Sequence, residues 1–150
     1  MFAIISRMPA EIRVAIYRHL IDTGRAPTTS EIAAQLGRDP ADVERAYTEL
    51  AESRVITFAP STRTIWMAHP FSATPTPYRV ESGGISYWAN CAWDALGIAA
   101  MLGRDTRCTC RCPDCAEPLD LSVSGGAVAG DAVIHFVVPA RRFWENVAYT

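Results

Sequence analysis

Three closely spaced helix signals constrain the fold of the first part of this chain more than any other feature. Apolar residues recur at intervals of three and four over positions 9–22, which predicts an amphipathic helix there. Thr28 and Glu31 have the spacing of a capping box, so a second helix is expected directly after Thr28. Asp39, followed by a proline, is an N-cap signal for a third helix over about 40–53.

Two β-prone runs follow these helices, at 55–58 and 64–68, with a turn rich in Pro, Ser and Thr between them. This pattern predicts a β-hairpin. Three helices followed by a hairpin is the order of elements in a winged helix. We therefore expect residues 1–68 to form a winged-helix-like helical domain.

The charge of the third predicted helix argues against DNA as a partner. Phosphate contacts need Arg or Lys on the helix that enters the groove. This helix has a single cation, Arg45, and its acids are Asp42, Glu44, Glu49 and Glu52. Residues 1–68 hold equal numbers of acids and arginines. We expect this domain to contact a protein or to cover a substrate rather than to bind DNA.

The composition changes after this domain. Segment 69–80 holds several prolines among small and hydroxyl residues, which predicts an ordered crossover between two lobes. Beyond it, Asn90 can cap a helix, apolar residues alternate over 119–123 as in a strand, and the apolar run 133–138 predicts a buried strand. Residues 81–150 are therefore expected to form a mixed α/β lobe, and the whole chain an α+β fold.

Composition and cysteine usage place the chain in a cytoplasmic class. With 49% apolar residues and a net charge of −2, it is neither disordered nor a strongly basic nucleic-acid binder. No apolar run approaches the ~20 residues of a membrane helix, and the start, interrupted by Arg7, is too short for a signal-peptide core. We expect no membrane partner. In a reducing cytoplasm the five cysteines are expected to act as thiols rather than as disulfides.

Cys91 and Asp94 form the most informative pair of residues. We place Cys91 at the first position of the predicted helix, where the positive end of the helix dipole can lower the pKa of a thiol and make it reactive. Asp94 follows three residues later, so its carboxylate lies on the same helix face and can share a ligand with the sulfur. The alternative is an inert buried thiol beside a carboxylate that only complements the dipole.

The surroundings of this pair are similar to the organomercurial lyases, also called alkylmercury lyases. The resemblance extends from about Met8 to the end, includes the winged-helix start, and is carried by three runs: Tyr87 to Leu96, Met67 to Ser72, and Cys112 to Pro118 with the alternating residues after it. It implies that the family's first catalytic cysteine falls on Cys91 and its catalytic aspartate on Asp94. Cys112 falls on a structural cysteine position.

The resemblance implies protonolysis of a carbon–mercury bond. Thiolate is a soft ligand and mercury(II) a soft cation, so Cys91 would capture an organomercurial substrate from small cellular thiols. A second thiolate would add electron density to the carbon, and Asp94 would deliver the proton that releases a hydrocarbon. The product Hg(II) would be held transiently by Cys91 and Asp94, until cellular thiols or a mercuric-ion-handling partner remove it. No organic cofactor is implied.

The sequence departs from the family pattern at the second catalytic cysteine. In the family that residue follows the stretch that Trp144 to Thr150 resembles, and this sequence ends before it. Either the chain is a shortened form that lacks the residue, or one of its clustered cysteines takes the role; the sequence leaves both open. We expect Phe143 and Trp144 to begin a closing segment with exposed apolar surface.

Four further cysteines lie close together: Cys108, Cys110, Cys112 and Cys115. Four sulfurs in one loop can wrap a soft metal ion. Zinc is less suited, because structural zinc sites usually divide their ligands into two well-separated pairs. The alternative, which we favour, is a loop of free or partly buried thiols.

The remaining candidates are aromatic residues and histidines. An apolar wall against the organic group on mercury can come from Trp88, Trp93, Phe71 and Tyr78, although core packing is the default for such residues. The histidines are expected to be packed or exposed rather than catalytic, and they are His19, His69 and His135, the last inside the predicted strand.

These observations together favour an enzyme of the alkylmercury lyase type with a role in mercury resistance. The alternative is a protein without catalysis, either a thiol-based metal-binding protein or a metal-responsive winged-helix regulator. The acidic third helix and the spacing of Cys91 and Asp94 favour the enzyme.

Overall fold

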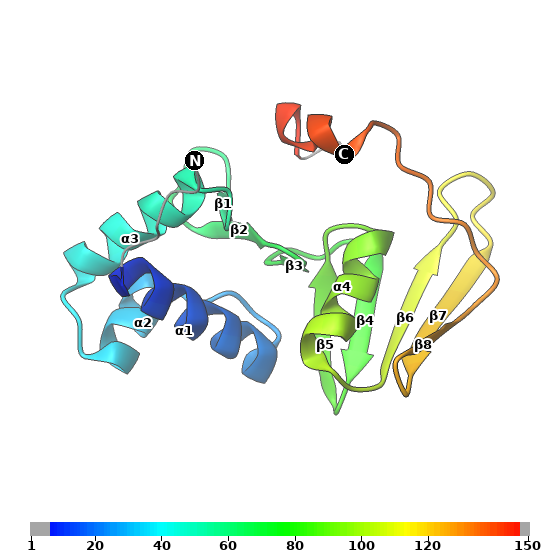
Figure 1. The fold of residues 1–150 in the computed structure, drawn as a ribbon, viewed down its shortest axis with the longest axis horizontal. Helices are drawn as coiled ribbons and strands as arrows, with labels where there is room; N and C mark the ends of the chain where they lie inside the picture. The colour runs from blue at the N-terminus through cyan, green and yellow to red at the C-terminus, as the bar shows by residue number, and fades with distance from the viewer. Residues whose placement is uncertain (1–6, 148–150) are drawn as a thin grey trace.

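The computed structural model describes residues 7–147. Its first part consists of three helices, α1 (Arg7–Thr23), α2 (Thr29–Leu36) and α3 (Pro40–Glu52), which lie together at one end of the molecule (Figure 1). Their apolar faces meet, and Ile12, Ile32 and Val43 are fully buried between them. All three predicted helices are therefore confirmed.

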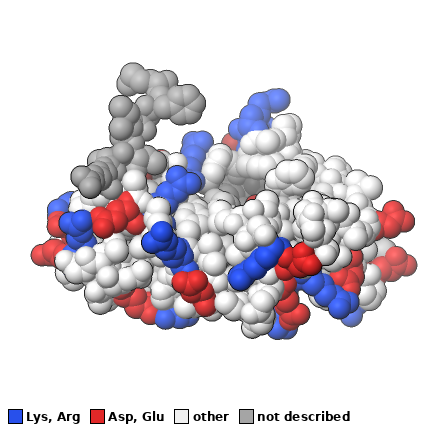
Figure 2. Space-filling model, turned by 60° about the horizontal axis from the view of Figure 1, so that its bottom comes forward, with Lys and Arg blue, Asp and Glu red and all other residues white. Residues whose placement is uncertain are grey.

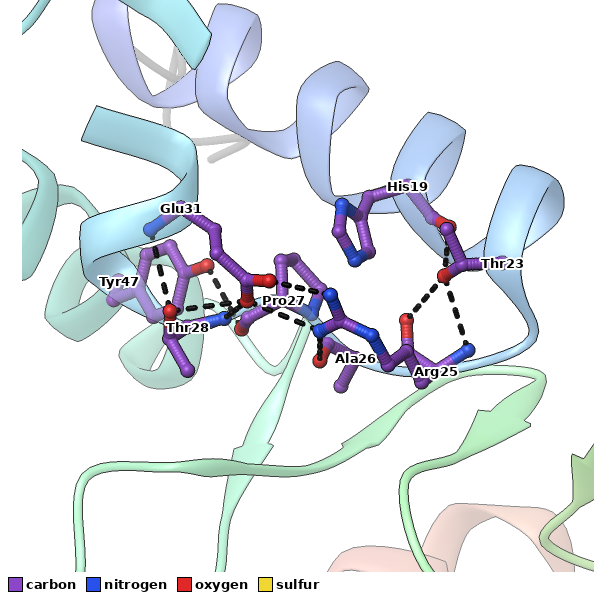
Figure 3. Close-up of polar contacts among 8 residues, drawn as sticks. All are labelled: His19, Thr23, Arg25, Ala26, Pro27, Thr28, Glu31 and Tyr47. Carbon is purple, nitrogen blue, oxygen red and sulfur yellow. Dashed lines mark hydrogen bonds and ion pairs between the residues drawn. The ribbon is translucent and has the colours of Figure 1, made fainter. Parts of the chain in front are cut away.

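The starts of α2 and α3 follow the local signals in the sequence. The Thr28 hydroxyl accepts from the Glu31 N–H at 3.2 Å, and the Glu31 carboxylate accepts from the Thr28 N–H at 2.8 Å, so the capping box is complete (Figure 3). Arg25 forms a salt bridge with the same carboxylate. Asp39 accepts from the Ala41 N–H at 2.8 Å and caps α3.

The strands after α3 form one eight-stranded sheet. They are β1 (Thr57–Phe58), β2 (Ile65–Ala68), β3 (Phe71–Ser72), β4 (Tyr78–Ser82), β5 (Ile85–Ala89), β6 (Thr106–Arg111), β7 (Pro118–Ser124) and β8 (Ala127–Ala129). Their order across the sheet is β1-β2-β3-β5-β4-β6-β7-β8, and neighbouring strands are antiparallel. The β1–β2 pair is the predicted hairpin, and the alternating run 119–123 lies in β7, as predicted.

Helix α4 (Ala92–Leu102) connects β5 to β6 and packs against β4 and β5 (Figure 1). It comes close to the turn between β2 and β3 at Gly97, where a Cβ atom would lie 3.2 Å from the Cβ of Pro70. That distance is tighter than an ordinary van der Waals contact. The close approach brings the first turn of α4 next to His69.

One hydrophobic cluster extends from α1 to β7 and joins the helices to the sheet. Two partly buried hydrogen bonds reinforce the junction. The Tyr87 hydroxyl donates to the Ile21 carbonyl at 2.7 Å, and the Tyr17 hydroxyl donates to the His69 carbonyl at 2.8 Å. Helices and antiparallel sheet together make an α+β fold. The division of the chain at residues 68 and 81 stays a prediction.

The segment after β8 differs from expectation. It forms no strand at 133–138; it leaves the sheet and passes over the molecule to a short 3-10 helix, η1 (Ala140–Glu145) (Figure 1). Val137 is 67% exposed, so the predicted buried strand is wrong. The Phe136 ring instead contacts Trp93 of α4, with ring centroids 5.9 Å apart. The run 133–138 thus has the apolar composition of a strand, but it packs on α4 through Phe136 and pairs with no strand.

Candidate active site

Cys91 lies at the start of α4, where it takes the N-cap position instead of the predicted first position inside the helix. It is the N-cap of the helix, and its sulfur accepts a hydrogen bond from the Asp94 N–H at 3.4 Å. The predicted cap at Asn90 is therefore wrong, because the cysteine takes the capping position. As the cap, Cys91 holds its sulfur against the first turn, beside Asp94.

Burial raises the pKa of the Cys91 thiol, and the negative charge of Asp94 raises it further. The backbone N–H groups of Asp94 and Trp93 act in the opposite direction but do not outweigh these effects. The expected lowering of this pKa by the helix terminus is therefore wrong, since desolvation penalises the thiolate more than the helix start stabilises it. Cys91 is accordingly a protonated thiol at neutral pH.

The carboxylate of Asp94 is held by two further side chains. Asn90 Nδ2 donates to Asp94 Oδ2 at 2.9 Å, and His69 Nδ1 lies 3.8 Å from the same oxygen. Asn90 Nδ2 also donates to the Pro70 carbonyl at 3.1 Å and lies 3.3 Å from His69 Nδ1. Asn90 thus links the first turn of α4 to the turn between β2 and β3, and fixes where the carboxylate points.

Sequence reasoning missed the placement of His69, Asn90 and Tyr17 around Asp94. The run Met67 to Ser72 was the available signal for His69, because it belongs to the stretch that resembles the lyases. Burial raises the pKa of Tyr17, and the Asp94 charge adds to that increase. The Tyr17 side chain therefore lies close enough to Asp94 to interact with its charge.

Two buried polar atoms at this place have no hydrogen-bond partner within residues 7–147, namely His69 Nε2 and Asn90 Oδ1. Buried polar groups in proteins are normally paired with protein or water. A buried water molecule beside Asp94 would satisfy both atoms.

An apolar pocket of about 510 Å³ lies beside the first turn of α4. Trp93, the residue before Asp94, forms one wall, and residues 136–140 with Phe143 form the others. The Phe136 ring stacks on Phe143 with centroids 5.6 Å apart, and its other neighbour is Trp93. The pocket is thus built by α4 and by the segment that the sequence misread as a strand.

The other predicted aromatic and histidine candidates lie elsewhere. Phe71 is 1% exposed and packs between Tyr17 and Tyr87, so core packing is confirmed for it. Trp88 and Tyr78 are half-buried in β5 and β4. His19 lies in α1, and its Nε2 is buried. His135 lies in the irregular segment after β8, so its predicted place in a strand is wrong.

The four clustered cysteines fall into two pairs instead of one loop. Cys108 and Cys110 lie in β6 and are 3% and 6% exposed, whereas Cys112 and Cys115 lie in the turn before β7. Burial raises the pKa of Cys108 to about 12. Across the described part of the chain, no group of three or more His, Cys, Asp or Glu side chains is arranged to hold a metal ion.

The surface shows no dominant sign of charge on the face seen in Figure 2, where arginines and acids alternate. Several arginines are paired with acids, for example Arg38 with Glu11 at 2.7 Å and Arg79 with Glu81 at 3.0 Å. No helix within the described residues has the length and apolar character needed to cross a bilayer.

Comparison with known proteins gives this site a context. The family model of the alkylmercury lyases matches residues 71–150, which include Cys91 and Asp94. A solved structure, the mercury-bound form of MerB2, has a TM-score of 0.68 and 27% sequence identity, and the match covers 83% of this chain. This chain spans 59% of the length of that MerB2 chain. A search of curated proteins finds no match. Since the family match takes in more than half of the chain, this protein belongs to the alkylmercury lyase family.

Proposed function

We propose that this protein cleaves the carbon–mercury bond of organomercurials by protonolysis, and releases a hydrocarbon and Hg(II). The observation that carries the proposal is the hydrogen bond from the Asp94 N–H to the Cys91 sulfur at the start of α4, which holds a thiol beside the residue that carries a carboxyl group. A soft-metal ligand and a proton donor are the two groups that this reaction needs side by side.

The steps follow from the state of each group. Cys91 begins as a thiol, and its sulfur displaces a small thiol from R–Hg–SR′, which leaves as R′SH with the Cys91 proton. A second cellular thiol gives its proton to the Asp94 carboxylate and adds to mercury as a thiolate, which increases the electron density on carbon. Asp94 then transfers a proton to that carbon, R–H leaves, and Hg(II) stays on sulfur. No oxidation state of the protein changes, and no organic cofactor takes part.

Asn90 and His69 act as positioning residues in this proposal. Asn90 donates to Asp94 Oδ2 and thereby fixes the orientation of the carboxylate. His69 lies 3.8 Å from the same carboxylate oxygen, close enough to return a proton to Asp94 through one water molecule. The proton donor can thus be restored after each turnover.

The apolar pocket beside Trp93 is the place we assign to the organic group on mercury. Its walls are aromatic and aliphatic, and Trp93 is 56% exposed toward it rather than packed in the core. Alkyl and aryl groups gain from transfer out of water at roughly 25 cal/mol per Å². Mercury would then lie between this pocket and the Cys91 sulfur.

The order of elements α1, α2, α3, β1 and β2 supports a winged helix for residues 1–68, with 69–80 as the crossover and 81–150 as the lyase-like domain. We assign the winged helix a role in covering the site. Its helix α3 is acidic, which disfavours DNA as a partner, and the Asp94 charge raises the pKa of Tyr17 in α1. We place the protein in the cytoplasm, where thiols exchange mercury, with a role in mercury resistance.

The test is hydrocarbon release from phenylmercury or methylmercury in excess thiol, measured by gas chromatography. We expect benzene or methane from the unmodified protein and none from Cys91→Ser. Asp94→Ala should keep mercury bound but release no hydrocarbon. Cys115→Ser, which removes an exposed thiol outside the site, is the matched control and should keep full turnover. Unchanged turnover in Asp94→Ala would refute the assignment.

A further inference from the structure

A second pair of thiols lies in the turn between β6 and β7. The strands pair up to Arg111 and Pro118, and the turn between them carries Cys112 and Cys115. Cys115 is exposed and Cys112 is half-buried. Neither belongs to the Cys91–Asp94 site, and both can be reached from solvent.

The conformation of this turn is well defined. The Cys112 N–H donates to the Glu117 carbonyl, and the Cys112 carbonyl accepts from the Ala116 N–H, both at 2.9 Å. The Arg111 guanidinium donates to the Ala116 carbonyl at 3.0 Å. Pro113 restricts the backbone directly after Cys112. The two cysteines are therefore held in place before any ligand arrives.

The sulfur of Cys112 is already surrounded by donors. It accepts hydrogen bonds from the backbone N–H groups of Cys115 and Asp114 and from the Cys115 thiol. Successive N–H groups that converge on one point form an anion-binding concavity, and the thiolate is the form of cysteine that binds metals.

The neighbouring pair in β6 does not offer the same site. Cys108 and Cys110 face the core, and burial raises the pKa of both thiols. A metal ion would have to enter the apolar core to reach them. Apart from Cys91, a soft cation therefore reaches accessible sulfur atoms at the Cys112–Cys115 turn.

The number of ligands selects the kind of ion. Structural zinc is bound by four ligands in a tetrahedron, and no group of three or more ligating side chains exists within the described residues. A soft cation that is satisfied by two thiolates fits better. We infer that the Cys112–Cys115 turn is a second mercury(II) site, which binds the ion through both sulfurs and is separate from the Cys91–Asp94 site.

Binding at this turn needs no redox partner. Two Hg–S bonds to the protein form as two Hg–S bonds to the carrier thiols break, and the two cysteine protons go to those thiols as they leave. The turn would hold Hg(II) whether or not the protein cleaves carbon–mercury bonds. The inference goes beyond the lyase proposal in this respect, and the two can fail independently.

The experiment uses Hg(II) alone and a protein that lacks the first site. Cys91→Ser is reduced, freed of reductant, and equilibrated with Hg(II) in excess glutathione, after which bound mercury is measured by atomic absorption and by sulfur-to-mercury absorption in the ultraviolet. Two linked thiolates compete with a free monothiol through their high effective concentration, so we expect about one equivalent of mercury to stay bound. Loss of all mercury from this variant would overturn the inference.

Two double variants locate the ion. Cys91→Ser/Cys115→Ser should lose the mercury. A single thiolate lacks the advantage over glutathione, on the order of 10²-fold, that two linked thiolates have. Cys91→Ser/Cys108→Ala removes a thiol outside the turn and should keep it, with circular dichroism to verify the fold. Mercury retained without Cys115, or lost from a folded Cys108 variant, would place the ion elsewhere and overturn the inference.

Discussion

Cys91 and Cys112 both accept hydrogen bonds from backbone N–H groups, yet their pKa values move in opposite directions. For Cys91, burial and the Asp94 charge outweigh the N–H donors. For Cys112, the hydrogen bonds from the donors outweigh the smaller effect of burial. Hydrogen bonds from backbone N–H groups therefore accompany a raised thiol pKa at Cys91 and a lowered thiol pKa at Cys112.

A labelling experiment at the residue scale follows from this difference. We expect Cys112 to react with iodoacetamide at lower pH than Cys91, because alkylation requires the thiolate. Asp94→Asn removes a negative charge that raises the pKa of Cys91, so the pH midpoint of Cys91 labelling should fall. Peptide mass spectrometry over a pH series gives both midpoints.

The control for this experiment is Asp105→Asn, which removes a carboxylate at the far end of α4 and should leave the Cys91 midpoint unchanged. A Cys91 midpoint that does not fall in Asp94→Asn, which keeps the backbone N–H, would mean that the Asp94 charge does not control the pKa of this thiol.

At the scale of the element, α2 shows how a short helix is fixed by its first turn. In Figure 3 the Glu31 carboxylate lies between Arg25 and Thr28. The Arg25 contact first and the Thr28 N–H second lower the pKa of Glu31 from 4.5 to about 2. A lowered pKa in the folded state stabilises the fold above the ordinary pKa, and this contribution is lost as the pH falls toward about 2.

The prediction for this element is that Thr28→Ala lowers the free energy of unfolding by about 1 kcal/mol, since the N-cap hydroxyl is lost. Urea denaturation followed by circular dichroism measures the change. Thr29→Ala, which replaces the first residue inside the helix by a better helix former, is the matched control and should cost less. Equal losses in both variants would show that the cap does not limit the stability of α2.

The elements also show what a sequence can and cannot predict. The starts of α2 and α3 were predicted because Thr28 and Asp39 act on their own next turn. The roles of His69 and Asn90 were not, because they arise where the β2–β3 turn meets α4, two segments without any shared periodicity. The run 133–138 was misread because its composition suits a strand, whereas its place is set by contact with Trp93.

At the scale of the whole molecule, the segment after β8 connects distant parts of the chain. In Figure 1 it runs along the β7–β8 edge of the sheet and then back toward the helices, and it carries Trp144, whose ring meets His69 edge-on with centroids 5.4 Å apart. The Arg54 guanidinium lies 5.3 Å from the centre of the same ring. Trp144 thus contacts Arg54, two residues after the end of α3, and His69, the residue that follows β2 and lies beside the Asp94 carboxylate.

Trp144→Ala should loosen this segment without unfolding the sheet. We expect faster hydrogen exchange and faster protease cleavage over residues 131–147, while β4 to β7 keep their protection, because the segment is held by a few aromatic contacts. Exchange measured by mass spectrometry checks this. Arg54→Ala, which removes only a contact worth roughly 0.5–1 kcal/mol, should give a smaller effect in the same region. An equal loss of protection in the sheet would show that the segment is part of the core.

The close approach of Gly97 to Pro70 also has an evolutionary consequence. A methyl group at position 97 would meet Pro70 at 3.2 Å, and the neighbours would have to give way where His69 and Asn90 meet Asp94. The exposed positions of α4 can accept many residues. Which residue fits at position 97, however, depends on the residue at position 70. A larger residue at 97 should therefore be accepted more readily when residue 70 changes with it, so two residues that take no part in the chemistry of the site are expected to vary together.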